Sequence, residues 1–274
     1  MEIVVLLKQV PATESLVKIA DDGVSIKTDD IKFVMNPYDE FAVEEALRIR
    51  ETQGGKVTII SVGTEKTIEA IRTALAMGAD EGILINDPAA IGCDALGIAR
   101  ILTAVVKGMP YDLIIAGQRA VDDDNYQVGG AVAEFLGIPG ISMVIKEEIA
   151  DGKIKCHRSI DGGIAVLEAP LPALFTTQRG LNEPRYASLP GIMKAKKKPL
   201  DTKTLADIGL DSAKVGESVT AIKAMQFPPE REGGRIIEGE TAQEKAGFSI
   251  NHYPCYRHSS HHPACLWPSS GKAL

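Results

Sequence analysis

The stretch LIIAGQRAVDDDNYQVGG, residues 113–130, decides the fold. Its first four residues form a continuous apolar run, which is typical of a strand covered by helices on both faces of a sheet. Gly117 follows as a turn residue, and a helical pattern begins at about Gln127. The stretch therefore predicts a strand, a loop and a helix in succession, which is the repeating unit of an α/β sheet.

The same alternation extends through the first half of the chain. Short apolar, β-branched runs at residues 3–7, 57–62 and 83–85 predict further strands. Amphipathic helical patterns follow these runs, and a helix over residues 38–51 places an apolar stripe on one side. We therefore expect a Rossmann-like α/β fold with a mostly parallel, doubly wound sheet.

Beyond residue 141 the pattern changes. Asp151-Gly152 and Asp161-Gly162-Gly163 are hairpin turn signals on either side of residues 153–160, which alternate with a period of two. We expect an antiparallel β meander there and a further strand at residues 171–177. A Pro-rich, basic loop is expected at residues 178–199.

The chain is expected to divide at about residue 220. Residues 1–220 form the α/β domain, including a loop at 182–198, and residues 221–274 form an extended C-terminal arm with an atypical tail. A short helical pattern lies at residues 238–246. The tail places Cys255, His258, His262 and Cys265 at a spacing like that of zinc ligands, but only three residues separate the two halves. We therefore expect no metal site.

Composition excludes several classes of protein. The 274 residues carry 30 Lys plus Arg against 37 Asp plus Glu, and the net charge of -7 lacks the broad positive surface of a nucleic-acid binder. No apolar run reaches the roughly 20 residues of a membrane span, and the N-terminus does not resemble a signal peptide. Four scattered cysteines fit a reducing compartment, so we expect a cytoplasmic or mitochondrial-matrix-like location.

Ligands of open α/β sheets bind at the carboxyl ends of the strands, where loops and helix N-termini present free N–H groups. This rule selects residues 6–8, 61–64 and 117–130 as a possible phosphate site. Asp122, Asp123 and Asp124 would repel a phosphate, so they either accept hydrogen bonds from ribose or form a plain acidic helix cap. Residues 36–39 predict a helix start with Asp39 as its N-cap.

Several catalytic motifs are missing from the sequence. No expected strand is followed by G-x-G-x-x-G or G-x-x-x-x-G-K-[ST], which disfavours a conventional dinucleotide site and a P-loop ATPase. A basic run at residues 194–198, preceded by Leu189, Ile192 and Met193, is either a solvated loop or a docking surface for an acidic protein partner.

One block of sequence is specific enough to point to a family. Residues 181–198 read LNEPRYASLPGIMKAKKK, and further blocks are MNP at 35–37, IRTALAMGAD at 71–80 and VDDD at 121–124. On these residues the chain resembles the β subunits of electron transfer flavoproteins up to about residue 245. Family members continue there with an amphipathic helix that holds the α subunit, whereas residues 247–274 depart from that pattern.

The resemblance implies an adenine-nucleotide-binding subunit of a heterodimer, whose larger α subunit carries most of the FAD. Such a pair is an electron carrier rather than a substrate-converting enzyme. It takes electrons from flavin dehydrogenases of the acyl-CoA dehydrogenase type in fatty acid β-oxidation and passes them to a quinone-linked oxidoreductase. The resemblance also implies that the β subunit holds an AMP at these residues: Leu6, Asn36, Pro37, Tyr38, Asp39, Val62, Gly117, Gln118, Arg119, Ala120, Val121, Asp122, Asp123, Asp124, Asn125, Tyr126, Gln127 and Val128.

The family's partner-recognition loop matches residues 185–198 here, with Leu189 as its apolar anchor. The partner-binding residues implied are Arg185, Tyr186, Leu189, Ile192, Met193, Lys194, Lys196, Lys197 and Lys198.

Three alternatives stay open. Electron-bifurcating members hold a second FAD in place of the AMP; their threonines are absent from residues 92–98 here, but residues 127–129 look more like their version. A regulatory nucleotide sensor without electron transfer is a rival from another class. An ATP pyrophosphatase would need a Ser-Gly-Gly loop after the first strand, which residues 8–11 do not supply.

Overall fold

A computed structural model describes residues 1–211, 215, 220–229 and 241–244. Residues Met1–Gln226 form one compact unit and Phe227–Leu274 a second one. The helix predicted at residues 238–246 lies mostly outside the described residues. The tail residues with a spacing like that of zinc ligands lie wholly outside them: Cys255, His258, His262 and Cys265. The division expected near residue 220 stays a prediction.

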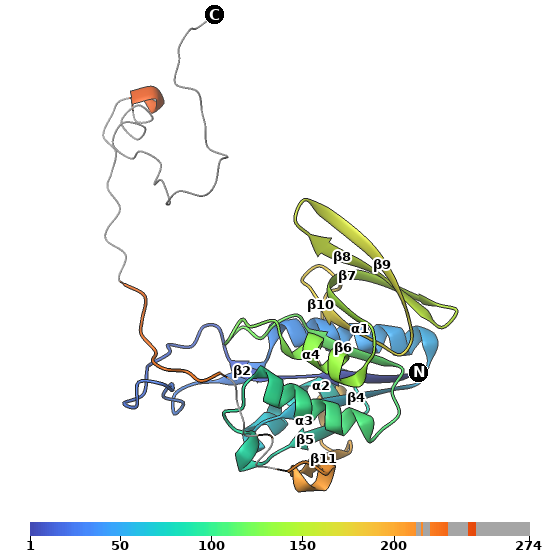
Figure 1. Cartoon of the computed structure of the whole chain (residues 1–274), viewed down its shortest axis with the longest axis horizontal. Coiled ribbons are helices and arrows are strands. Elements are labelled where there is room, and N and C mark those ends of the chain that lie inside the picture. The colour runs from blue at the N-terminus through green and yellow to red at the C-terminus, as the bar shows by residue number, and fades with distance from the viewer. Residues whose placement is uncertain (212–214, 216–219, 230–240, 245–274) are drawn as a thin grey trace, which may run out of the picture. The chain divides into compact units, whose positions relative to one another are not determined.

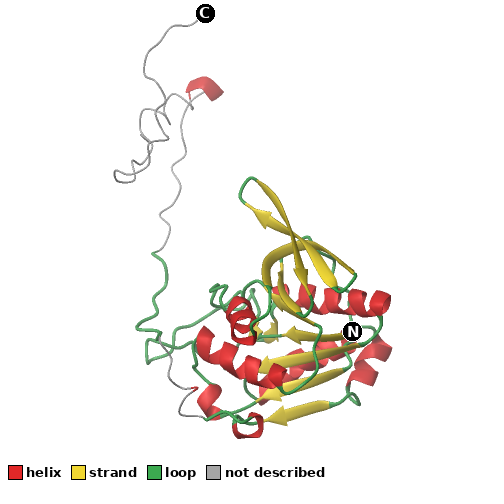
Figure 2. Ribbon diagram, turned by 45° about the vertical axis from the view of Figure 1, so that its right-hand side comes forward, coloured by secondary structure: helices red, strands yellow, loops and turns green. Residues whose placement is uncertain are grey.

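The described part of the first unit is organised around a nine-stranded sheet with the order β11-β5-β4-β1-β6-β10-β7-β8-β9 (Figures 1 and 2). Its strands are β1 (Glu2–Leu6), β4 (Lys56–Val62), β5 (Glu81–Ile85), β6 (Leu113–Gly117), β7 (Gly140–Ala150), β8 (Lys153–Ile160), β9 (Gly163–Pro170), β10 (Ala173–Thr177) and β11 (Leu200–Lys203). All neighbours from β11 to β7 are parallel. Strands β7, β8 and β9 are antiparallel, and they project from the end of the sheet in Figure 2. The expected parallel sheet with a meander is confirmed.

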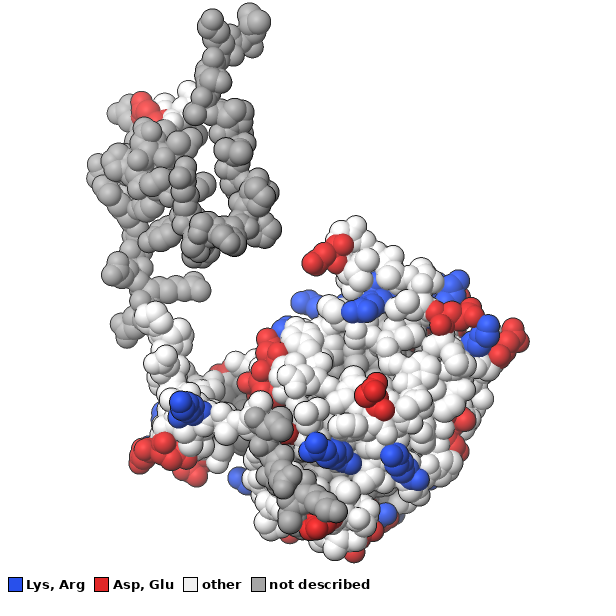
Figure 3. Space-filling view, in the orientation of Figure 1, with Lys and Arg blue, Asp and Glu red and all other residues white. Residues whose placement is uncertain are grey.

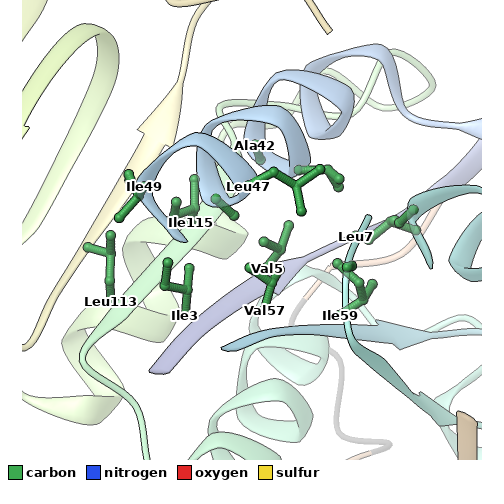
Figure 4. Close-up of a cluster of buried hydrophobic side chains, with 14 of the residues drawn as sticks. Ile3, Val5, Leu7, Ala42, Leu47, Ile49, Val57, Ile59, Leu113 and Ile115 are labelled. Atoms are coloured by element: carbon green, nitrogen blue, oxygen red, sulfur yellow. The ribbon is translucent and has the colours of Figure 1, made fainter. Parts of the chain in front are cut away.

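Helices cover both faces of the sheet. The long ones are α1 (Pro37–Gln53), α2 (Ile68–Met77), α3 (Ala95–Lys107) and α4 (Val128–Leu136), and short 3-10 turns lie at Glu65–Thr67, Pro88–Ala90 and Ala206–Ile208. Ile3 and Val5 of β1 join the core under α1 and α2 (Figure 4), whereas Val4 and Leu6 join the core under α3 and α4. Burial of each such side chain stabilises the fold by roughly 1.5–3 kcal/mol. The sheet is therefore doubly wound.

The structure corrects one element and adds others. Within residues 178–199, which we expected to form a loop, Leu189–Ala195 form helix α5. Its start is stabilised because the Ser188 hydroxyl accepts the N–H of Gly191 at 3.1 Å, and Pro190 in the first turn has no N–H to satisfy. Strand β11 and a small antiparallel pair, β2 (Gln9–Pro11) with β3 (Phe33–Met35), were not expected.

Charge is dispersed over the face of the described residues that Figure 3 shows. On the face in Figure 3, basic and acidic side chains are interspersed and the described residues form no continuous basic area. None of the helices in the described ranges is long and apolar enough to cross a membrane.

Helix α1 buries acidic residues that its sequence pattern places outside the apolar stripe. Glu44 and Glu45 are only 2% and 7% exposed. Glu45 faces Glu147 of β7, and burial together with the hydrogen bond and the charge of Glu45 raises the pKa of Glu147 to about 7. Near neutral pH the Glu147 carboxyl is therefore still partly protonated.

This pair predicts a pH-dependent stability. Because the folded pKa of Glu147 lies above its unfolded value of 4.5, its contribution to stability is complete at acid pH and is lost as the pH rises through about 7. Glu147→Gln should gain stability over the wild type between about pH 5 and pH 8, by on the order of 1 kcal/mol after solvent screening. Urea unfolding at several pH values measures this difference.

A matched control lies on the same strand. Glu148 pairs with Lys146 at 2.7 Å and is exposed, so Glu148→Gln should show no such gain. A pH-independent difference between Glu147→Gln and the wild type would contradict the raised pKa of Glu147.

Candidate functional site

A cavity of about 240 Å³ lies at the carboxyl ends of β1, β4 and β6. These are the strand ends that the sequence selected as a ligand site. The predicted nucleotide residues that line it are Leu6, Asn36, Asp39, Val62, Gly117, Gln118, Arg119, Ala120, Asp123, Asn125, Tyr126, Gln127 and Val128. The structure thus brings together segments that are far apart in the chain.

The other predicted residues, Pro37, Tyr38, Val121, Asp122 and Asp124, are not among those lining the cavity. Four of them contact or adjoin residues that are, as described below.

Sequence reasoning also missed part of the wall. The additional lining residues are Leu7, Lys8, Ala90, Gly92, Cys93, Ala95, Ile98, Leu102, Ala116 and Gly129. Of these, Leu7, Lys8 and Gly129 lie within segments 6–8 and 117–130, which the strand-end rule had selected. The part from Ala90 to Leu102 is mostly small and apolar, and nothing in such residues distinguishes a cavity wall from ordinary core.

Asp39 has a different role from the one expected. The N-cap of α1 is Asn36, and Asp39 lies inside the first turn, so its prediction as the N-cap was wrong. Pro37 can begin the helix because its fixed backbone suits the first turn and it has no N–H. The Asp39 carboxylate instead accepts the N–H of Lys8 at 2.7 Å and that of Gly117 at 3.0 Å. It therefore joins the ends of β1 and β6 to α1.

The buried position of Asp39 also affects its ionisation. Burial raises the pKa of this carboxyl to about 7, although its two backbone hydrogen bonds favour the charged form.

Two side chains hold the loop after β6 against α1. The amide of Asn36 donates to the carbonyl of Arg119 at 2.9 Å and accepts the N–H of Val121 at 3.2 Å. The Arg119 guanidinium donates to the Tyr38 hydroxyl and to Asp124, both at 2.8 Å, and lies over the rings of Tyr38 and Tyr126. Tyr38, Val121 and Asp124 thus do not line the cavity, but they hold the lining residues Arg119 and Asn36 in place.

The three consecutive aspartates make ion pairs rather than a helix cap. Lys8 Nζ lies 2.8 Å from Asp122 and 3.0 Å from Asp123. Burial lowers the pKa of Lys8, but the hydrogen bonds and charges of the two aspartates outweigh it and raise that pKa overall. Helix α4 is capped at Gln127 without a side-chain hydrogen bond, so the interpretation as a plain acidic cap was wrong.

Uncapped, α4 offers the first-turn N–H groups of a helix to the cavity, which Gln127, Val128 and Gly129 line. Such a helix start attracts an anion.

The backbone of this loop is constrained at both ends. A Cβ at Gly117 would lie 2.3 Å from Asp39 Oδ1 and 2.8 Å from Tyr38 Cβ, so only glycine fits there. Asp124 and Tyr126 adopt positive φ angles of 53° and 61°, which side chains other than glycine seldom do. Strain of this kind persists only where neighbouring contacts hold it, and here Arg119 contacts both residues.

Comparison with known proteins identifies the family. The model of the electron transfer flavoprotein domain matches residues 24–208. The electron transfer flavoprotein subunit beta of Bacillus subtilis (strain 168) is 40% identical over 250 residues, which cover 89% of this chain and 94% of that protein. The chain belongs to the electron transfer flavoprotein β-subunit family.

Other relatives of the same name are equally similar. The subunit beta of Bradyrhizobium diazoefficiens (strain JCM 10833 / BCRC 13528 / IAM 13628 / NBRC 14792 / USDA 110) is 44% identical over 214 residues, covering 77% of this chain and 84% of the relative. The Homo sapiens subunit is 38% identical over 242 residues, covering 87% and 93%. The resemblance stated from the sequence blocks is confirmed.

Residues 182–198 present an apolar group outward, and we call them the recognition segment after the partner-recognition loop that the sequence led us to expect there. Tyr186 is 99% exposed, Leu189 80% and Met193 65%, and Ile192 is also exposed. We call these four residues the apolar knob. Lys194, Lys196 and Lys197 are exposed around it.

Two residues predicted to bind a partner make contacts within their own chain. The guanidinium of Arg185 contacts Glu44 at 2.7 Å and Glu51 at 2.6 Å on α1. Lys198 Nζ donates to the carbonyls of Ala79, Leu75 and Gly78 at the end of α2, and burial lowers its pKa. Their positive charge did not reveal these internal contacts, because the carboxylates and carbonyls lie far away in the sequence.

The described residues contain no group of three or more His, Cys, Asp or Glu side chains placed to hold a metal ion.

The close approach at Gly117 gives a direct test of the site's construction. Gly117→Ala forces Asp39 or Tyr38 to move, so urea unfolding should show a loss of about 2–3 kcal/mol. Gly130→Ala is the control, because a Cβ there meets nothing within 4 Å and alanine favours a helix by up to about 1 kcal/mol. Equal stability of the two variants would contradict the packing described for Gly117.

Proposed function

We propose that this chain is the β subunit of a heterodimeric electron carrier whose α subunit holds most of the FAD. The observation that carries the proposal is that the family match, residues 24–208, spans both the loop after β6 and the recognition segment. The relatives' name, subunit beta, supports a complex with another subunit.

In this proposal the pair takes electrons from flavin dehydrogenases of the acyl-CoA dehydrogenase type, as in fatty acid β-oxidation, and passes them to a quinone-linked oxidoreductase. FAD, when bound, supplies the reversible uptake of electrons. The chain itself contributes docking, through the apolar knob, and a rigid scaffold. A cytoplasmic or matrix-like location is part of the same proposal.

We further propose that the cavity holds AMP, and its residues suit that ligand. The buried Oε1 of Gln118 has no hydrogen-bond partner among the described residues, and an adenine amino group would supply a donor. The start of α4 suits the phosphate. Asp123 and Asn125 line the cavity as polar groups for ribose hydroxyls.

The nucleotide content of the purified heterodimer tests this proposal. Because the residues that line the cavity suit one mononucleotide, acid release followed by chromatography should give one AMP and one FAD per heterodimer. Gln118→Leu should lower the AMP content several-fold without changing the FAD content, whereas Gln53→Leu, an exposed control, should change neither. Two FAD and no AMP would contradict the proposal.

That result would favour the second candidate, an electron-bifurcating subunit with its own FAD. One observation supports it: a more open hollow of about 700 Å³ shares Lys8 and Val62 with the cavity and continues to Thr64, Lys66 and Asn86. A larger dinucleotide would find room there. A non-redox sensor, the remaining rival, would purify without a flavin-bearing partner.

Leu189 is the proposed anchor for the dehydrogenase. An apolar knob with a basic rim suits an apolar pocket with an acidic rim, and a contact this small dissociates quickly. Leu189→Ala should slow flavin reduction by a dehydrogenase about tenfold at limiting carrier concentration, without loss of cofactors. Stopped-flow absorbance measures the rate.

Leu16→Ala removes an equally exposed leucine, 89% exposed, that lies outside the recognition segment. It should leave the rate unchanged. Unaltered transfer by Leu189→Ala, or equal slowing by both variants, would refute the anchor.

A further inference from the structure

Arg185 occupies the start of the recognition segment with its charge directed inward. Its Nε lies 2.7 Å and its Nη2 3.1 Å from the two carboxylate oxygens of Glu44, and Nη1 lies 2.6 Å from Glu51. Its backbone N–H also donates to Glu44 at 3.2 Å. One side chain thereby joins the segment to two turns of α1 by a bidentate and a second ion pair.

The acidic side of this contact is fixed. The side chain of Glu44 is only 3% exposed and also accepts a hydrogen bond from Arg48 at 2.7 Å. Burial raises the pKa of Glu44, but the hydrogen bonds from Arg185 and Arg48 outweigh it and hold that pKa below its usual value. Beside it, Asn182 donates to Glu45 at 2.7 Å and to the Phe41 carbonyl at 3.0 Å.

The other end of the segment is fastened separately, to α2. Arg72 donates to the carbonyls of Ala195 and Lys198. The Nζ of Lys198 in turn donates to the carbonyl of Ala79 at the end of α2. In between, a Cβ at Gly191 would lie 2.5 Å from the Ala76 carbonyl, so α5 lies directly on the α2 backbone. The end toward α2 does not depend on Arg185.

Leu189, Ile192 and Met193 of the apolar knob lie on α5, and Tyr186 lies between Arg185 and the start of that helix. Tyr186 directly follows Arg185 and is 99% exposed. Contacts of the Tyr186 side chain therefore contribute almost nothing to fixing the position of this residue. A free segment loses conformational entropy on docking, and a segment already fixed in its bound shape avoids that loss.

We propose that Arg185 is a positioning residue: by joining Glu44 and Glu51 of α1, it fixes Tyr186 and the chain that enters α5, completes the apolar knob for docking and does not itself contact the partner. The proposal rests on the docking role given above for the knob. Arg185 thus differs from Lys194, Lys196 and Lys197, whose exposed charges remain free to meet an acidic rim.

The first test is made on the heterodimer without a dehydrogenase. Amide hydrogen exchange of the holo heterodimer should rise about tenfold in the peptide covering residues 186–193 for Arg185→Met, and stay unchanged in residues 117–128. Glu51→Gln, which leaves the buried Glu44 pair intact, should give a smaller rise. Lys196→Met removes an exposed charge from the same segment and should give none. Unchanged exchange in Arg185→Met and Glu51→Gln overturns the proposal.

The second test measures transfer, with the carrier as the varied substrate of a flavin dehydrogenase. Arg185→Met should raise KM about tenfold with kcat unchanged, and Glu51→Gln should raise it about threefold. Arg185→Lys should fall between wild type and Arg185→Met, because a single ammonium group cannot span both carboxylates. A raised KM in Arg185→Met with no change in Glu51→Gln would mean direct contact with the partner and would overturn the proposal.

Failure of the docking role gives a different pattern. If exchange rises as expected but KM is unchanged in both Arg185→Met and Leu189→Ala, Arg185 positions the segment and the docking function is refuted.

Discussion

The carboxylate of Asp39 is the contact on which the arrangement of the molecule depends. It accepts N–H groups from the chain leaving β1 and from the end of β6, while its own backbone belongs to the first turn of α1. Loss of the carboxylate would leave the N–H groups of Lys8 and Gly117 without an acceptor, at a cost of roughly 1–3 kcal/mol each. The same contact requires glycine at 117, where no Cβ fits. The position of α1 and the floor of the cavity are therefore set together.

Helix α1 consequently serves two regions. Its start supplies Asn36 and Asp39 to the cavity wall and the Tyr38 hydroxyl to Arg119 of that wall. Its flank supplies Glu44 and Glu51 to the recognition segment. Because a helix is stiff, the cavity at its start and the recognition segment along its side keep a constant separation.

The sequence predicted the parts of this structure that depend on local pattern. Alternating apolar runs and amphipathic helices gave the parallel sheet, the turns at 151–152 and 161–163 gave the meander, and strand ends gave the cavity. What it could not give depends on residues distant in the chain. Nothing in the local sequence distinguishes Arg185 and Lys198 from exposed basic residues, because their partners on α1 and α2 are distant in the chain. Asp39 has the local pattern of an N-cap, and only its contact with Gly117 at the end of β6 shows its role. Helix α5 was missed because prolines suggested a loop, although proline is well tolerated in a first helical turn.

The strand order constrains how the chain can assemble. Strand β10 lies between β6 and β7, yet it is made after both of them and after β8 and β9. During synthesis the meander can form early, since its strands are joined by tight turns, but it has no place in the main sheet until residues 173–177 emerge. The edge of β5 likewise stays open until β11 follows, more than a hundred residues later. A nascent chain that stops short of β10 therefore carries two separate sheets with uncovered edges, and such edges invite pairing with other chains.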